Sequence, residues 1–237
     1  QLGDGTTNNR NIPTQTSSFA SNQMGALSER DFDGDGVLNI FDVHNNLDYQ
    51  ETAISSGALH TCAILDDGSV SCWGNGNNGE LGNGGTSDKS TPTLTSSLGT
   101  GRTAVAISSG STHTCALLDD GSVSCWGDNG YGQLGTGTNT DRSAPTQTDS
   151  FGIGRTAVAI SSGNLHTCAI LDDGSVSCWG WNGHNQIGDS TSSNRNQPTQ
   201  TSSLGTGRTA VAISAGQGHT CAILDDGSVS CWGDNDY

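Results

Sequence analysis

The sequence predicts an all-β protein, a β-propeller built of four-stranded blades. Three observations predict this class. A block of 53 residues recurs four times, each block contains four short stretches typical of strands, and outside one insert no segment has the 3.6-residue periodicity of a helix. Only 31% of residues are hydrophobic and 35 are glycine, so stacked repeats or covalent links must supplement a thin core.

The repeat is easiest to see in its central part. The string His-Thr-Cys-Ala begins at His60, His113, His166 and His219. The string Asp-Asp-Gly-Ser-Val-Ser-Cys-Trp-Gly follows each time, beginning at Asp66, Asp119, Asp172 and Asp225. The four prolines share one repeat position: Pro13, Pro92, Pro145 and Pro198. One supersecondary unit is therefore repeated along the chain.

Each element of one unit can be assigned from its local sequence. Residues 103–107 carry β-branched and small residues and predict a first strand, after which Ser-Ser-Gly turns the chain. Residues 113–118 and 122–126 predict a hairpin whose three-residue loop ends on Gly121. A glycine-rich and asparagine-rich loop leads to a fourth short strand near residues 145–148. Four strands in about 50 residues are typical of a propeller blade.

The repeats are interrupted once and cut within a blade. The segment 1–3 matches 133–135, and the segment 232–237 matches 126–131. We assign residues 1–19 and 52–237 to the propeller and residues 20–51 to an insert. The four repeats form either a complete ring or part of a larger propeller. Because the chain opens without Met or a leader, we expect a removed signal peptide or a piece of a longer protein.

The charge excludes several classes of function. Eight basic residues stand against 24 acidic ones, for a net charge of −16. Nucleic-acid binding requires clustered Lys and Arg, so it is disfavoured, as is binding to anionic membranes. No apolar run is long enough for membrane insertion.

The cysteines predict disulfides within the hairpins. The pairs are Cys62/Cys72, Cys115/Cys125, Cys168/Cys178 and Cys221/Cys231. With a three-residue loop, the two cysteines of each pair face each other across the hairpin. They occupy a non-hydrogen-bonded position, where the Cα atoms of the two strands are closest. Disulfides place the protein outside a reducing cytosol. The alternative, metal binding by His and Cys, is less favoured because zinc sites use closer Cys spacings. We expect the repeated histidines to be structural and bonded to backbone, with a metal site around the axis as the alternative.

The insert contains a pattern typical of a calcium-binding loop. Oxygen ligands fall at loop positions 1, 3, 5, 9 and 12, a glycine stands at position 6, and a backbone carbonyl is available at position 7. The predicted Ca²⁺ ligands are Asp31, Asp33, Asp35, Val37, Asn39 and Asp42. The loop resembles those of dockerins and thrombospondin type 3 repeats. An acidic turn without an ion is the alternative.

No set of residues predicts an active site. No nucleophile-elbow or phosphate-loop motif occurs, and the recurring Asp-Asp pairs are typical of turns. The repeats differ from one another mainly in two loops, one before each His and one after each Trp-Gly. Loops on a rigid sheet scaffold commonly bind partners. The predicted partner-binding residues are Trp181, Tyr131, His184, Arg195 and Arg142; drift at exposed loop tips is the alternative.

The motif that runs from Gly110 to Leu117, through Asp120-Gly121, Val123 and Trp126-Gly127, to Asn129 and Gly132-Gln133-Leu134-Gly135 resembles a known repeat. It is similar to the repeat of the regulator of chromosome condensation family and resembles secreted, cysteine-containing prokaryotic versions. The resemblance covers nearly the whole chain outside the insert. It implies a β-propeller, normally of seven blades, and protein–protein binding as the class of function. The acidic charge and the cysteines argue against the chromatin-bound exchange-factor role of the founding member.

Together these observations predict a non-catalytic extracellular or cell-surface scaffold. It would bind a protein or glycan partner through its variable loops and would be stabilised by disulfides and a structural calcium ion. One alternative is a filament or surface-layer subunit that joins copies of itself head to tail by completing a blade between chains. Another is a lyase or hydrolase that acts on polysaccharides, because some propellers carry catalytic residues in a single blade.

Overall fold

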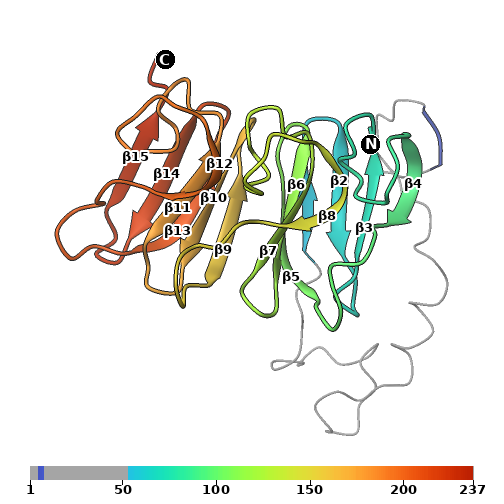
Figure 1. Ribbon diagram of the computed structural model, residues 1–237, viewed down its shortest axis with the longest axis horizontal. Helices are drawn as coiled ribbons and strands as arrows, with labels where there is room; N and C mark the ends of the chain where they lie inside the picture. Colours follow the sequence, from blue (N-terminus) through green and yellow to red (C-terminus); the bar gives the residue numbers. More distant parts are fainter. Residues whose placement is uncertain (1–4, 8–52, 237) are drawn as a thin grey trace, which may run out of the picture.

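The computed structural model describes residues 5–7 and 53–236, which form four antiparallel sheets arranged side by side (Figure 1). Blade 1 contains β1 (Ile54–Ser56), β2 (His60–Ile64), β3 (Val70–Gly74) and β4 (Lys89–Leu94). Blade 2 contains β5 (Ala104–Ser109), β6 (His113–Leu118), β7 (Val123–Gly127) and β8 (Arg142–Gln147). Blade 3 contains β9 (Ala157–Ser162), β10 (His166–Leu171), β11 (Val176–Gly180) and β12 (Arg195–Gln200). Blade 4 contains β13 (Ala210–Ala215), β14 (His219–Leu224) and β15 (Val229–Gly233).

Neighbouring strands in each blade follow chain order, which confirms the predicted all-β architecture. Blades 1 to 3 have four strands each, and blade 4 has three among the described residues. The four blades form an open row across the described residues and do not close into a ring (Figure 1). In the described part of the chain, no helix is long and apolar enough to cross a membrane.

Two strand boundaries differ from the prediction. The inner strand of blade 2 continues through Ser108 and Ser109, which were expected to turn the chain. Both serines pair with β6, and the Ser109 amide also donates to the Ser55 hydroxyl of blade 1 at 2.9 Å. The outer strand begins at Arg142, three residues before the predicted segment, because it follows the edge of β7 with a bulge.

The hairpin tips contact the next blade closely. Gly121 has φ 74°, and an added Cβ would lie 2.6 Å from the Cβ of Thr156 in blade 3. Its carbonyl accepts a hydrogen bond from the Ala157 amide at 2.9 Å. A glycine at this position therefore permits both the left-handed turn and the approach of the neighbouring sheet.

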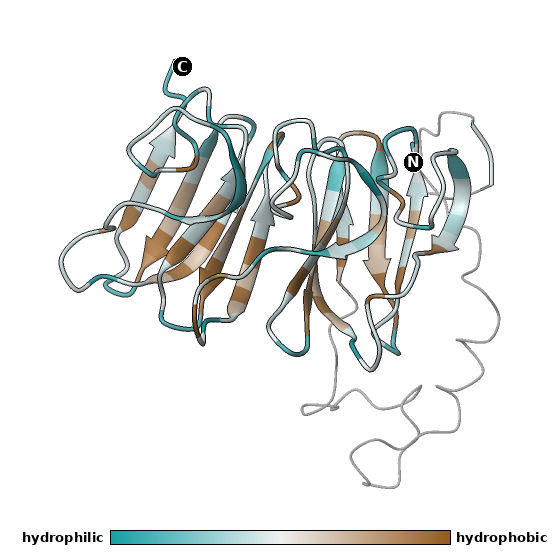
Figure 2. Ribbon diagram, viewed as in Figure 1, coloured by the Kyte–Doolittle hydropathy of each residue, from teal (hydrophilic) through white to brown (hydrophobic). Residues whose placement is uncertain are grey.

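The hydrophobic core lies between blades. We call the side of a blade toward the next repeat its front face and the opposite side its rear face. The front face of blade 2 and the rear face of blade 3 bury one cluster: Cys115, Leu117, Val123, Cys125, Leu134, Ala157, Ala169, Leu171 and Trp179. Figure 2 shows hydrophobic residues concentrated on the strands and hydrophilic residues in the connecting loops. Each blade is thus stabilised mainly by its neighbours.

The disulfides and the hairpin register agree with the prediction. Cys115 pairs with Cys125 across β6 and β7, and their Cα atoms are 4.1 Å apart. The same arrangement joins Cys62 to Cys72, Cys168 to Cys178 and Cys221 to Cys231. All eight cysteines are therefore paired within hairpins.

Blade 4 differs from the other blades at its front face. Ile223 is 45% exposed and Val229 is 61% exposed, whereas the equivalent Ile170 and Val176 of blade 3 are 2% and 1% exposed. No strand among the described residues pairs with the outer edge of β15. The sequence of this face is the same as in blade 3, so its exposure results from the absence of a following blade among the described residues.

Candidate binding site

The two variable loops of each repeat lie together at one end of the blades. The amide that follows each Trp-Gly donates to the carbonyl of the residue before each His. The Trp181 amide, for example, lies 2.8 Å from the Leu165 oxygen, and Asp128 makes the equivalent bond to Thr112 at 2.9 Å. Both loops therefore lie at the upper end of the blades in Figure 1, opposite the hairpin tips.

Three of the predicted partner-binding residues form a cluster at this end. The ring centroids of Tyr131 in blade 2 and Trp181 in blade 3 are 6.4 Å apart, and the rings are tilted by 58°. The rings of Trp181 and His184 meet edge to face, with centroids 5.0 Å apart. We call Tyr131, Trp181 and His184 the aromatic site. Tyr131 is 40% exposed, and His184 is also exposed.

Local packing orients the aromatic site. A Cβ added to Gly183 would lie 2.6 Å from the Trp181 indole, so the indole rests directly on this glycine. On the other side, His184 Nε2 lies 4.0 Å from a carboxylate oxygen of Asp234 in blade 4. The aromatic site therefore joins blades 2 and 3 and contacts blade 4, so it is not confined to a single loop.

Trp181 replaces a residue that stabilises the loop in blade 2. There Asp128 accepts a hydrogen bond from Gln133 Nε2 at 2.9 Å. In blade 3 the equivalent Gln186 is fully buried, and its Nε2 has no partner among the described residues. A buried donor without a partner costs about 1–3 kcal/mol. The Trp181 side chain therefore does not replace the hydrogen bond that the Asp128 carboxylate provides in blade 2.

The same loop contains backbone strain that blade 2 avoids. Asn185 and Ser190 each have φ 65°, in the left-handed region. Glycine stands at the equivalent positions of blade 2, where Gly132 and Gly137 have φ 84° and 73°. A left-handed conformation costs a non-glycine residue roughly 1–2 kcal/mol, least for Asn. Strained residues of this kind cluster at functional sites.

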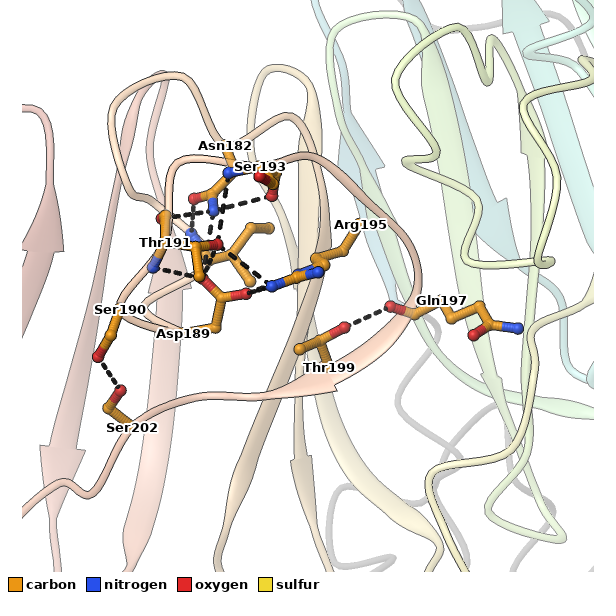
Figure 3. A network of polar contacts seen from close by, with 10 residues as sticks. Asn182, Asp189, Ser190, Thr191, Ser193, Arg195, Gln197, Thr199 and Ser202 are labelled. Atoms are coloured by element: carbon orange, nitrogen blue, oxygen red, sulfur yellow. Dashed lines mark hydrogen bonds and ion pairs between the residues drawn. The ribbon is translucent and has the colours of Figure 1, made fainter.

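A polar network holds the rest of the loop in place (Figure 3). The Asn182 side chain donates to the carbonyls of Thr191 and Ser193 at 2.8 and 3.0 Å. Arg195 Nε donates to Asp189 Oδ2 at 2.6 Å. Partial burial alone would raise the pKa of Asp189, but hydrogen bonds from Thr191 and Arg195 outweigh burial and lower that pKa.

The two predicted arginines are placed differently from the aromatic residues. Arg195 lies in the ion pair with Asp189 and therefore holds its own loop. Arg142 begins β8, and its Nε is buried without a hydrogen-bond partner among the described residues. The structure thus brings together the aromatic candidates and assigns Arg195 to loop support.

The repeated histidines have a different partner from the one expected. In three of the four, Nε2 meets the hydroxyl of a threonine in the next blade and not a backbone group; for His219, no blade among the described residues follows. The pairs are His60–Thr114 at 2.7 Å, His113–Thr167 at 2.8 Å and His166–Thr220 at 2.9 Å. The recurring His-Thr-Cys string contains these threonines, but the sequence alone does not pair them with the histidines, because the partners lie 54 residues apart.

The inner strands of the four blades line a shallow hollow. Its walls contain the Ser-Gly segments of blades 1 to 3, such as Ser109 and Gly110, and the Ala215-Gly216 segment of blade 4. The backbone of these lining residues already joins the blades: the Ser162 amide donates to Ser108 Oγ at 2.8 Å, and the Ala215 amide donates to Ser161 Oγ at 2.9 Å. This inner wall is therefore committed to blade packing.

Metal binding has no candidate in the folded blades. Residues 5–7 and 53–236 contain no group of three or more His, Cys, Asp or Glu side chains arranged to hold an ion. The predicted calcium ligands Asp31, Asp33, Asp35, Val37, Asn39 and Asp42 lie outside the described residues.

Comparison with known families identifies the repeat. Two models of the regulator of chromosome condensation (RCC1) repeat match the chain, one over residues 52–80, 104–133, 157–186 and 210–237 and the other over 67–117, 120–170 and 173–223. The chain belongs to the RCC1 repeat family. The matches to the second model each run from one blade into the next, as expected of a repeat whose core lies between blades.

The RCC1 repeats resemble curated relatives along most of the described region. The chain is 32% identical over 185 residues to the human E3 ubiquitin-protein ligase HERC2, covering 77% of this chain and 4% of that protein. It is 32% identical over 184 residues to the ultraviolet-B receptor UVR8 of Arabidopsis thaliana, covering 78% of this chain and 41% of the receptor. The chain thus spans less than half of either relative.

Solved structures share the same propeller fold. Human WBSCR16 superposes with a TM-score of 0.68 at 22% identity, covering 77% of this chain and 47% of that one. Prp20p of Saccharomyces cerevisiae superposes with a TM-score of 0.66 at 23% identity, covering 78% and 43%. At this level of identity the likeness shows the fold alone.

Proposed function

We propose that this RCC1-repeat chain is a non-catalytic binding module that engages an extracellular protein or glycan partner through the aromatic site. The observation that carries the proposal is the replacement of the loop carboxylate by Trp181. In blade 2 the residue at this position satisfies a buried glutamine, whereas in blade 3 it faces two other rings at the surface.

The energetics of the loop support a binding function for Trp181. Trp181 leaves Gln186 Nε2 unpaired, and the same loop holds Asn185 and Ser190 in left-handed conformations. These features destabilise the loop, and drift at an exposed tip gives no reason for all three to occur in one blade. Local rules of stability are broken mainly where function requires it. A partly exposed tryptophan on a rigid scaffold, such as Trp181, is a common anchor of binding interfaces.

The class of partner is inferred from chemistry and from the family. Aromatic rings with adjacent polar groups bind protein side chains and sugar rings, since both combine apolar surface with hydrogen-bonding groups. The structure reported for Prp20p was studied for its binding to Gsp1p and histones, so a protein partner has a precedent within the fold. With a net charge of −16, this chain would favour partners that are not strongly acidic.

An extracellular or cell-surface location and bound calcium belong to the same proposal. Four disulfides support an oxidising compartment. The oxygen-rich pattern from Asp31 to Asp42 supports calcium binding, which would order the insert and take no part in chemistry.

The test compares two variants on defined ligand panels. The labelled chain is applied to an array of extracellular proteins and to a glycan array, alongside W181D and I153D. Ile153 is fully exposed, but it lies in a loop at the opposite end of the blades, so I153D controls for an added surface charge. We expect at least one ligand whose binding falls tenfold or more in W181D and is unchanged in I153D. Equal binding of every ligand to W181D and to the unmodified chain, or the absence of any ligand, would contradict the proposal.

A further inference from the structure

The hollow between the inner strands continues into the aromatic site through blade 3. The loop before each repeated His has two variable residues, and the first of the two lines the hollow in every blade. In blade 3 this residue is Asn164. The next residue, Leu165, accepts the hydrogen bond of 2.8 Å from the Trp181 amide. A residue that lines the hollow is therefore next in sequence to the residue that holds Trp181.

Blade 4 makes a second connection between the hollow and the aromatic site. Gln217 lines the hollow, and Gly218 follows it. A Cβ added to Gly218 would lie 3.4 Å from Oδ2 of Asp234 and 3.6 Å from Cδ2 of His184. A side chain at position 218 would thus occupy the space beside His184, between the aromatic site and the hollow.

The backbone does not require a glycine at position 218. The φ angle of Gly218 lies outside the left-handed region, so any residue can adopt this conformation. The other blades carry a side chain at the equivalent position: Leu59, Thr112 and Leu165. Glycine loses more conformational freedom on folding than any other residue. Its presence in this blade is therefore best explained by the open surface that it leaves beside His184.

The side chains at the rim of the hollow are not engaged in blade packing. The backbone of Asn164 joins the blades, since its amide donates to the Gly216 carbonyl and its carbonyl accepts from the Ser111 amide, both at 3.2 Å. The side-chain amides of Asn164 and Gln217, however, have no hydrogen-bond partner in the part of the chain that the structure describes. The equivalent residue of blade 1 is Ala58. The rim thus presents amide groups in the two blades that flank Trp181 and His184.

The chemistry of the hollow favours an uncharged ligand with many hydroxyl groups. Its volume is about 350 Å³, within the range of sites for small ligands. The twelve lining residues are all Ser, Gly, Ala, Asn or Gln, and none is ionisable, although the chain has 32 charged residues (8 basic and 24 acidic). Hydroxyl and amide side chains both donate and accept hydrogen bonds. Sugar hydroxyls do the same, so they match this lining.

A protein partner matches this surface less well. The centre of a protein interface is usually rich in aromatic residues, Met and Arg that fill desolvated pockets. The apolar side chains of the hollow are limited to Ala58 and Ala215. The three rings of the aromatic site lie to one side, so the surface has one apolar end and one polar end. A sugar chain offers both chemistries, because its rings have apolar C–H faces and hydroxyl edges.

We propose that the aromatic site and the hollow form one continuous binding surface for a neutral oligosaccharide. One sugar ring rests against Trp181. The chain of sugars then passes over Gly218 into the hollow, where its hydroxyls bond to the side chains of Asn164 and Gln217. This inference rests on the proposed function of the aromatic site and makes it specific, since it selects a glycan over a protein and excludes charged glycans.

The first experiment tests the class of ligand. The chain is applied to an array of glucose, mannose and N-acetylglucosamine oligomers, and to the same oligomers carrying sulfate or carboxylate groups. We expect a neutral oligomer to bind. Its affinity should change by less than about twofold between about 0.05 and 0.5 M NaCl, because neither the oligomer nor the hollow is charged. Preferential binding of an acidic oligomer, or strong salt dependence, would overturn the proposal.

Two variants that copy other blades test the path of the bound oligomer. N164A introduces the residue of blade 1 and should weaken binding about threefold to tenfold, as expected for lost hydrogen bonds. G218L introduces the residue of blades 1 and 3 and should weaken binding by about tenfold or more, because its side chain blocks the passage. N77A and G85L are the matched controls and should bind normally. Asn77 and Gly85 are exposed in a loop of blade 1, and neither has a left-handed backbone.

The outcomes separate this inference from the proposed function. If W181D weakens binding of the oligomer but N164A and G218L bind as the unmodified chain does, the inference is overturned and the proposed function stands. A protein ligand that depends on Trp181, with no neutral oligomer bound, has the same meaning. If no ligand depends on Trp181, both proposals fail. Thermal unfolding of each variant shows whether it is folded, and N164A with N77A decides the result if G218L is not.

Discussion

The Nε2 atom of His113 in blade 2 lies 2.8 Å from the Oγ1 atom of Thr167 in blade 3, and the same pair joins blades 1 and 2 and blades 3 and 4. The Thr167 hydroxyl donates to the Gln133 carbonyl at 3.0 Å, so it accepts from the imidazole. Nε2 therefore carries the hydrogen, and the buried Nδ1 has no partner among the described residues. The junction thus requires a neutral histidine.

This arrangement predicts a loss of stability in mild acid. Burial lowers the pKa of His60 and His166 to about 4 and that of His113 to about 3, compared with 6.5 in the unfolded chain. Because the unfolded state binds protons first, the free energy of unfolding should be constant above pH 6.5 and fall between pH 6.5 and pH 4. Between pH 7 and pH 4.5 each histidine should contribute a loss of about 2–3 kcal/mol, measured by urea titration.

The variant H113Q tests whether a neutral His113 causes part of this pH dependence. H113Q can keep a donor toward Thr167 but cannot be protonated, so its pH dependence in this range should be weaker by about a third. Hydrogen bonds from Ser122 lower the pKa of Asp120, so this carboxylate stays ionised and does not contribute to the loss of stability between pH 7 and pH 4.5. Equal stability of the unmodified chain at pH 7 and pH 4.5 would contradict the neutral-histidine junction.

Two valines in identical local sequence should respond differently to truncation. Val176 is buried between blades, whereas Val229 lies on the open front face of blade 4. V176A should lower the free energy of unfolding by about 2 kcal/mol, because it removes buried methyl groups and leaves a cavity. V229A should change it by less than about 0.5 kcal/mol in the monomer. Similar losses in both variants would show that blade 4 is covered in solution.

Removing disulfides should separate the effect of cross-linking from that of packing. Each bond closes a loop with a sequence separation of 10, which contributes about 2.5–3 kcal/mol in the chain-entropy model. The pair C115A/C125A should lose this amount plus the packing of two fully buried sulfurs. The pair C221A/C231A should lose less, because Cys231 is exposed. Chemical denaturation of both variants measures the difference, and a larger loss in the second pair would refute the prediction.

Restoring a carboxylate at position 181 should stabilise the loop. In W181D the new side chain can accept from Gln186 Nε2, as Asp128 does from Gln133 in blade 2. We expect the free energy of unfolding to rise by about 1 kcal/mol, the value of a typical hydrogen bond. The reciprocal variant D128A should lower it, since Gln133 would lose its acceptor. A destabilised W181D would mean that packing of the half-buried Trp181 ring contributes more stability than the new hydrogen bond.

Calcium binding can be measured directly at the insert. Isothermal titration of the full chain should show one Ca²⁺ per chain, and D31N/D35N should abolish the heat because it removes two charged ligands. D48N lies in the insert outside the predicted ligand positions and should leave binding intact. Absence of binding by the unmodified chain would leave an acidic turn as the correct interpretation.

Local features were predictable because they depend on short stretches of chain. The three-residue loop that ends on Gly121 determines the hairpin register, so the pairing of Cys115 with Cys125 followed from counting residues. The divergence of Trp181 among otherwise similar repeats identifies it as a candidate from the sequence alone.

Contacts between blades were not predictable in the same way. Thr167 and His113 are 54 residues apart, and nothing in either strand specifies which side chain of the next sheet will face it. The unpaired Nε2 of Gln186 became visible only by comparison with the hydrogen bond between Asp128 and Gln133.

The sequence by itself determined the repeat, the strands, the hairpin disulfides and the residues in which one blade differs from another, because turn chemistry and spacing act within a single unit. The tertiary structure alone decided that Tyr131 and Trp181 of adjacent blades lie in contact, that Arg195 forms an ion pair with Asp189, and that the front face of blade 4 is exposed. These properties depend on how sheets stack, and side chains on identical strands acquire different surroundings according to the neighbour they receive.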